Sequence, residues 1–286
     1  MNRLIITDLD NTIYNWVDYF APCFRAMVHA LARETNETED DLIASFCQVY
    51  ELHGSVEYAF SVQELSILRD RTEDEIAELV RIAKGAFKRV RDKRLEPYPT
   101  VGKTLHWLRS QGDRIVAVTN APVGYAYKRL SKLRIVNLFD GIGGKLDYDV
   151  PTSKVTEKIL GKSAEGFFTP TILAWAFEND ELKPGHKGYA RVIRDLNITA
   201  DRVWVVGDNT QRDLAPAIKL GATGIWARYG ENVDKKNLDT ILRLTSWRKE
   251  KIMSEPLDAP FMEINDFSEL INILPASQLS LEGLKW

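Results

Sequence analysis

Residues 4–16, LIITDLDNTIYNW, decide the fold of this protein. A run of four apolar and β-branched residues predicts a strand that enters a buried sheet, yet the run is followed by Asp8 and Asp10, one residue apart. A buried strand does not normally finish in paired negative charges, because burying a charge is costly. Either the two carboxylates lie at a solvated strand end, or a positive group lies between them.

The composition is that of an ordinary globular protein. The chain has 286 residues, of which 44% are hydrophobic and 28% charged, and its net charge is −3. No basic excess points to a nucleic acid polymer or to an anionic membrane as partner. The N-terminal apolar run is too short for a signal peptide, and no segment approaches the ~18 apolar residues of a membrane span. We therefore expect a cytoplasmic protein, whose oligomeric state the sequence leaves unknown.

From about residue 16 to residue 94 every segment has helical periodicity. The apolar spacing predicts helices over residues 17–34, 38–52 and 72–94, and residues 55–70 can supply another. The last of the three begins after Thr72 with acidic residues and ends in basic ones, as the helix dipole favours. These residues predict an all-helical block of domain size.

After residue 96 predicted strands alternate with predicted helices. This alternation predicts an α/β fold with a doubly wound, mainly parallel, Rossmann-like sheet. The helical block then forms a cap domain, residues 16–95, inserted into a catalytic core of residues 1–15 and 96–286. Residues 145–182 and 230–260 show no clear periodicity, and their structure and role are not predicted.

Polar residues stand where the predicted strands end or the helices begin. In a parallel sheet the carboxyl ends of the strands meet at one edge, where ligands bind. Taken singly, each residue has a plain structural explanation, such as a turn cap, a surface lysine, a first-turn acid or a buried strand threonine. Together they favour a site. The residues are Asp8, Asp10, Thr119, Asn120, Lys183, Asp208 and Asp213.

These residues resemble the motifs of the haloacid dehalogenase superfamily of phosphohydrolases. Its Asp-x-Asp-x-Thr element matches residues 8–12, its strand-end Ser/Thr matches Thr119, its Lys-Pro element matches residues 183–184, and its Gly-Asp-x-x-x-x-Asp element matches residues 207–213. The resemblance covers residues 1–15 and about 96–228, with the motifs in the family's order. Each motif alone is weak, but the ordered set is specific.

The resemblance implies a mechanism. Asp8 would attack phosphorus and form an aspartyl-phosphate. Mg²⁺ would be held by Asp8, the backbone carbonyl of Asp10 and Asp208, with Asp213 in support, because hard cations take oxygen ligands. Asp10 would protonate the leaving group and then activate water.

The remaining motif residues would bind the phosphate. Thr119, Asn120 and the backbone N–H groups near them would contact phosphoryl oxygens, and Lys183 would neutralise charge on Asp8 and on the phosphate. A cation and a lysine among the aspartates would thus answer the question posed by residues 4–16.

The presence of Asp10 favours hydrolysis of phosphate monoesters over cleavage of carbon–halogen bonds, because an ester oxygen must be protonated as it leaves. A phosphomutase of the same superfamily remains an alternative. A receiver-like signalling protein is a weaker alternative. In such proteins the acid pair lies on the first strand and the phosphoacceptor on a later strand, which is the reverse of the order expected here.

The sequence predicts a small phosphorylated metabolite as substrate, without identifying it. The DLDNTIY stretch looks like that of pyrimidine 5′-nucleotidase-type members, and Tyr14 and Trp16, which follow, can stack a nucleobase. Packing at a domain junction explains the same aromatic residues more simply. Sugar phosphates and phosphoglycolate stay equally open.

Overall fold

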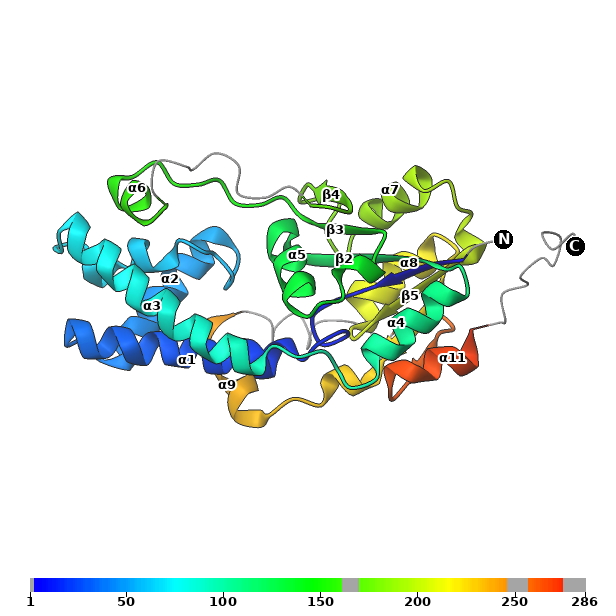
Figure 1. Cartoon of the computed structure of the whole chain (residues 1–286), viewed down its shortest axis with the longest axis horizontal. Coiled ribbons are helices and arrows are strands. Elements are labelled where there is room, and N and C mark those ends of the chain that lie inside the picture. Colours follow the sequence, from blue (N-terminus) through cyan, green and yellow to red (C-terminus); the bar gives the residue numbers. More distant parts are fainter. Residues whose placement is uncertain (1–2, 161–169, 246–256, 275–286) are drawn as a thin grey trace, which may run out of the picture.

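A seven-stranded sheet forms the centre of the molecule (Figure 1). The computed structural model describes residues 3–160, 170–245 and 257–274. Within them all strand pairs are parallel, in the order β4-β3-β2-β1-β5-β6-β7. The predicted α/β fold with a parallel Rossmann-like sheet is therefore confirmed. The strands are β1 Leu4–Thr7, β2 Arg114–Pro122, β3 Gly141–Lys145, β4 Leu173–Phe177, β5 Val203–Gly207, β6 Thr223–Ala227 and β7 Met262–Ile264.

Helices cover both faces of the sheet, because successive strand residues point to opposite sides. Leu4 and Ile6 face a hydrophobic core that includes Tyr189 of α7, whereas Ile5 faces a second core that includes Leu105 of α4. The second core continues into the helical block between β1 and β2. The helices on the two faces are α4 Val101–Ser110, α5 Val123–Lys132, α7 Lys187–Asp195, α8 Ala215–Lys219 and α11 Leu270–Ile273.

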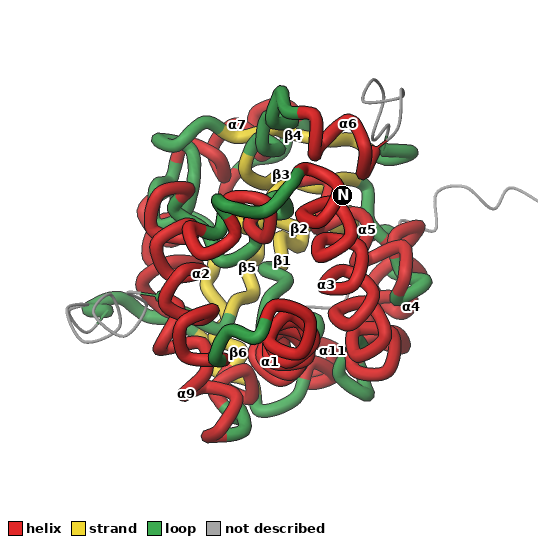
Figure 2. The backbone as a smooth tube through the Cα atoms, turned by 90° about the vertical axis from the view of Figure 1, so that its left-hand side faces the viewer, coloured by secondary structure: helices red, strands yellow, loops and turns green. Residues whose placement is uncertain are grey.

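Three long helices form the helical block between β1 and β2, which stands over the carboxyl ends of the strands (Figures 1 and 2). The Thr72 side chain and Glu75 form a reciprocal capping box at the start of the third helix. The prediction of another helix over residues 55–70 is wrong. Two short 3₁₀ helices lie there, Ser61–Glu64 and Ser66–Leu68, because Val62, Leu65 and Leu68 turn into the core at a spacing of three. The long helices are α1 Trp16–Thr35, α2 Glu39–His53 and α3 Glu73–Arg94.

The two segments that the sequence left unassigned add elements to both parts of the molecule. The first forms α6, Lys154–Leu160, and the edge strand β4, and the second forms α9, Lys235–Leu244. Helix α6 packs on α3, and α9 packs on α1 and α2 (Figure 1). Segments that leave the sheet after β3 and β6 therefore hold the helical block from two sides.

Polar contacts fix both helices to the block. On α6, Lys158 pairs with Asp74 at 2.6 Å, and on α9, Asn237 accepts a hydrogen bond from Arg25 at 2.7 Å. The division into a core of residues 1–15 and 96–286 and a cap of residues 16–95 stays a prediction. In the described ranges we find no helix long and apolar enough to cross a lipid bilayer.

Candidate active site

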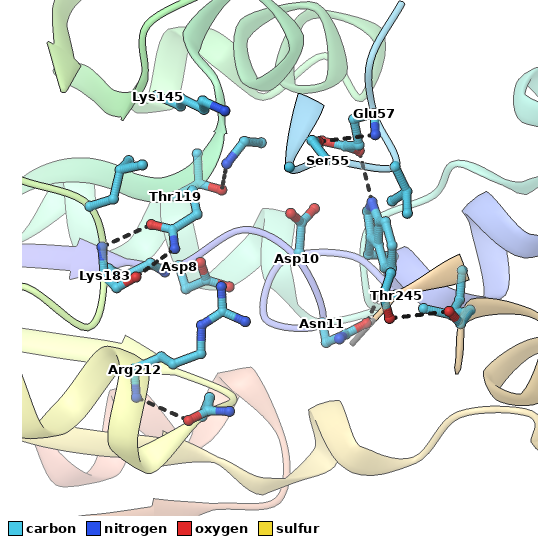
Figure 3. Close-up of a pocket in the computed structure, with 18 of the residues that line it drawn as sticks. Asp8, Asp10, Asn11, Ser55, Glu57, Thr119, Lys145, Lys183, Arg212 and Thr245 are labelled. Carbon is cyan, nitrogen blue, oxygen red and sulfur yellow. Dashed lines mark hydrogen bonds and ion pairs between the residues drawn. The ribbon is translucent and has the colours of Figure 1, made fainter. Parts of the chain in front are cut away.

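The polar residues at the carboxyl edge of the sheet line one cavity of about 950 Å³ between the sheet and the helical block (Figure 3). Asp8 follows β1, Thr119 lies in β2 and Asp208 follows β5. Lys183 precedes α7 and reaches the same point. Residues that are up to 205 positions apart in the sequence are thus brought together by the parallel topology.

A buried lysine links two of the carboxylates. The Lys183 ammonium donates to Asp8 Oδ1 and, at 2.6 Å, to Asp213 Oδ1. All three side chains are at least nine-tenths buried. The other Asp213 oxygen accepts from the Asn209 amide at 3.0 Å, so both of its oxygens are already engaged. Asp213 therefore anchors the lysine.

Oxygen atoms of Asp8, Asp208 and Asp213 all lie within 4.8 Å of one another. The Lys183 ammonium contacts two of these carboxylates, Asp8 and Asp213, in a buried site where unpaired charge is costly. Oxygen donors at this spacing are the ligands that Mg²⁺ takes. The residues present therefore fit a divalent cation.

Burial and charge shift the pKa values of this cluster. Loss of water raises the pKa of Asp8, Lys183 lowers it, and the neighbouring Asp213 and Asp208 raise it further, so the net shift is upward. Burial alone would lower the pKa of Lys183, but attraction to Asp213 and Asp8 outweighs it and the net shift is again upward. Lys183 consequently keeps its charge.

The turn that carries Asp8 is held in place by its neighbours. Asn11 adopts a left-handed conformation with φ of 59°, which asparagine tolerates better than most residues. A Cβ at Gly230 would lie 2.2 Å from the Asn11 carbonyl oxygen, so only glycine allows this close approach. Tyr229 Oη donates to the Thr12 carbonyl at 2.7 Å. The chain after β6 therefore closes over the turn.

Asn120 positions Lys183. Its Oδ1 accepts from the Lys183 amide at 2.9 Å, and its Nδ2 donates to the Lys183 carbonyl at 2.7 Å. Both polar groups of the side chain are thus occupied by the backbone of Lys183. The Asn120 side chain thus fixes the lysine that lies against Asp8, and phosphate binding by Asn120 stays a prediction.

Asp10 lies in a different environment from Asp8. Arg129 of α5, itself 7% exposed, donates from Nη1 to Asp10 Oδ1 at 3.2 Å and from Nη2 to Glu57 Oε1. Glu57, from the helical block, also accepts from Trp16 Nε1 at 2.9 Å. Burial raises the pKa of Asp10, Arg129 lowers it and Glu57 raises it, with a net upward shift. The side chain of Asp10 therefore belongs to a network that reaches into the helical block.

Comparison with known proteins agrees with this geometry. The profile of the haloacid dehalogenase-like hydrolases matches residues 2–221, which is more than two thirds of the chain. The chain belongs to this family. A glyceraldehyde 3-phosphate phosphatase from Methanopyrus kandleri is 23% identical over 247 residues, covering 84% of this chain and 91% of that protein. The predicted superfamily and the prediction of an enzyme are confirmed, and the name of this relative agrees with a phosphatase.

Two solved structures share the fold of this hydrolase. A phosphatase of the family from Thermococcus onnurineus superposes with a TM-score of 0.52 at 18% identity, covering 98% of this chain and all of that chain. A 2-haloacid dehalogenase from Pseudomonas syringae superposes with a TM-score of 0.55 at 18% identity, covering 96% and 98%. Both likenesses concern the fold alone.

The seven polar residues predicted for the site all line the cavity, but of the two aromatic residues predicted to contact substrate only one does. Thr119 is buried, lines the cavity and accepts from the Ala121 amide at 3.1 Å. Trp16 also lines the cavity, stacked on Phe20. Tyr14 does not, because its hydroxyl accepts from buried Arg129 at 3.3 Å. Its place beside Asp10 makes packing the better explanation for Tyr14.

The site also includes charged residues that no motif contains, among them Arg129, Glu57 and Lys145. Arg129 and Glu57 belong to segments predicted to be helical, where charged residues are normally exposed. Lys145 ends β3 at the start of an unassigned segment. Of these three residues, only Lys145 could have been recognised from the sequence as a candidate site residue, because it lies at the end of a predicted strand.

Proposed function

We propose that this hydrolase is a Mg²⁺-dependent phosphomonoesterase that acts on a small phosphorylated metabolite through an aspartyl-phosphate on Asp8. The observation that carries the proposal is the joint approach of Lys183, Asp213 and Asp208 to Asp8. A carboxylate that attacks a phosphate dianion meets like-charge repulsion, and this arrangement supports both a cation and an ammonium group beside it.

Each residue then has a role. Asp8, Asp208 and the Asp10 carbonyl would hold Mg²⁺, with Asp213 in support, and the cation would neutralise charge on the phosphoryl group. Lys183 holds the Asp8 carboxylate in position and neutralises negative charge beside it. Thr119 lies in β2, three residues before its end, and would donate to a phosphoryl oxygen.

Asp10 would act as general acid and then as general base. Its carboxylate lies two residues from the nucleophile and faces the cavity in Figure 3. In the first step it gives a proton to the leaving ester oxygen, and in the second it takes a proton from the water that attacks the aspartyl-phosphate. Carbon–halogen cleavage needs no such proton, so the position of Asp10 favours phosphate esters.

The aromatic wall at Trp16 favours a nucleoside 5′-monophosphate as one candidate substrate, because its ring lines the cavity and can stack a base. The relative that acts on glyceraldehyde 3-phosphate favours a short sugar phosphate instead. Family membership argues against a receiver-like protein. A phosphomutase would release an isomer of its substrate in place of inorganic phosphate.

Assays of phosphate ester hydrolysis test the proposal in two steps. Hydrolysis of p-nitrophenyl phosphate should require Mg²⁺ and stop when excess chelator is added. A panel of nucleotides, sugar phosphates and short-chain phosphates, scored by kcat/KM and by release of inorganic phosphate, then ranks the substrates. Full activity in excess chelator would rule out the metal, and isomer formation without phosphate release would indicate a mutase.

A further inference from the structure

Lys145 is the last residue of β3, and it lines the cavity from the side of Thr119 (Figure 3). It lies opposite Pro122 in the strand register, so it stands beside the end of β2. The strands approach closely here, because a Cβ at the preceding Gly144 would lie 2.6 Å from the Ala121 carbonyl oxygen. Lys145 therefore lines the cavity beside the strand that carries Thr119 of the proposed phosphate site.

Among the described residues Lys145 has no carboxylate partner, in contrast to Lys183 and Arg243 of the same cavity. Lys183 is paired with Asp8 and Asp213, and Arg243 with Asp40 at 3.0 Å. The nearest acid along the chain, Asp147, accepts from the Gly124 amide at 3.0 Å. The charge of Lys145 is consequently available to a ligand.

The surroundings hold this ammonium group in place. Its nitrogen lies 4.8 Å from the centre of the Tyr148 ring, a cation–π distance. The residue is half-buried, so its charge is screened less than that of a surface lysine. Across the cavity, Glu57 is paired with Arg129. A half-buried ammonium group held by an aromatic ring is better placed to bind an anion than an ammonium group in open solvent.

We propose that Lys145 binds a second anionic group of the substrate, so that the enzyme favours short-chain phosphate monoesters that also carry a carboxylate or a second phosphate. The inference rests on the proposed phosphatase function and narrows its substrate class. The first phosphate would occupy the site at Asp8, Thr119 and Lys183, which already has its own ammonium group.

Matched substrate pairs test this inference. 3-Phosphoglycerate and glycerol 3-phosphate differ by a carboxylate, and fructose 1,6-bisphosphate and fructose 6-phosphate differ by a phosphate. The wild-type enzyme should favour the more acidic member of at least one pair by about tenfold in kcat/KM, because a hydrogen bond between charged groups is worth that much or more. The pair with the larger ratio identifies the anionic group.

Variants at position 145 then test whether Lys145 causes the preference for the more acidic substrate. Lys145→Met and Lys145→Gln should abolish it by raising KM for the acidic member about tenfold, with little change for its partner. Lys145→Arg should retain most of it. Lys154→Met is the matched control, because Lys154 is an exposed lysine of α6 outside the cavity lining.

Two results would overturn the inference. The first is that the wild-type enzyme does not discriminate within either pair. The second is that the neutral variants lose activity equally on both members, which would make Lys145 a ligand of the reacting phosphate. If p-nitrophenyl phosphate is hydrolysed with Mg²⁺ and either result is found, only this inference fails. If no phosphate ester is hydrolysed at all, the proposed function fails as well.

Discussion

The two aspartates that follow β1 lie two residues apart but face different parts of the molecule. Asp8 contacts Lys183 and lies against Asp208 and Asp213, all from the sheet-forming part of the chain. Asp10 contacts Arg129, which in turn binds Glu57 of the helical block. A nucleophile needs a fixed charge environment, whereas an acid–base residue must respond to the bound substrate. The difference in surroundings supports the two roles that we propose for Asp8 and Asp10.

The largest expected effect comes from the Asp8 side. Asp8→Asn removes the attacking carboxylate and should lower kcat on p-nitrophenyl phosphate by at least about a thousandfold, while the fold is retained. Steady-state kinetics measures kcat, and circular dichroism measures whether the fold is retained. Activity within about tenfold of the wild type would show that Asp8 is not the nucleophile.

Asp10→Asn tests the other side of the comparison. Loss of a general acid–base residue should lower kcat for an alkyl phosphate by about a hundredfold to ten-thousandfold. Mg²⁺ affinity, measured by calorimetry, should change little because only the backbone carbonyl of Asp10 would be a ligand. A collapse of metal affinity would mean that the role assignment is wrong.

Glu57→Gln isolates the connection between Asp10 and the helical block. The amide keeps the shape that accepts from Trp16 but loses the charge opposite buried Arg129, so the free energy of unfolding should fall by about 2 kcal/mol. kcat should fall more for an alkyl phosphate than for p-nitrophenyl phosphate, because only the alkyl leaving group needs a proton. Exposed Glu34→Gln is the control. Equal loss on both substrates would contradict a link to Asp10.

The smallest effects concern the two helices that hold the block. Asn237→Ala on α9 removes hydrogen bonds to Arg25 and Asp18 from a residue that is 7% exposed, and should cost about 1–2 kcal/mol of stability. Lys158→Ala on α6 removes an exposed ion pair and should cost under about 1 kcal/mol. Urea denaturation measures both. A larger loss at Lys158 would show that α6 is the stronger attachment.

Most of the site is predictable from the sequence because a parallel sheet brings strand ends together. Asp8, Thr119 and Asp208 each stand at a predicted strand end, so topology alone predicts their approach. Arg129 was not predictable as a site residue, since nothing in the local pattern separates a buried arginine from the usual solvent-facing one.

The fold was predictable to a similar extent. Strands β1, β2 and β5 are short apolar runs that end in polar residues, and α1 to α3 have clear apolar spacing. Strand β4 was missed because it is an edge strand with three of its five residues exposed. Helix α9 was missed because its attachment depends on contacts with α1 and α2, which are distant in the sequence.

The central claim is that Asp8 becomes phosphorylated, and the Asp10→Asn variant tests it most directly. p-Nitrophenolate leaves without a proton, so this variant should complete the first step and stall at the second. Mixing with p-nitrophenyl phosphate and Mg²⁺ should release about one equivalent of p-nitrophenol in a burst, and acid quench with peptide mapping should place one phosphoryl group on Asp8. Phosphate on another residue, or slow release with no burst and no phosphorylated peptide, would contradict the account.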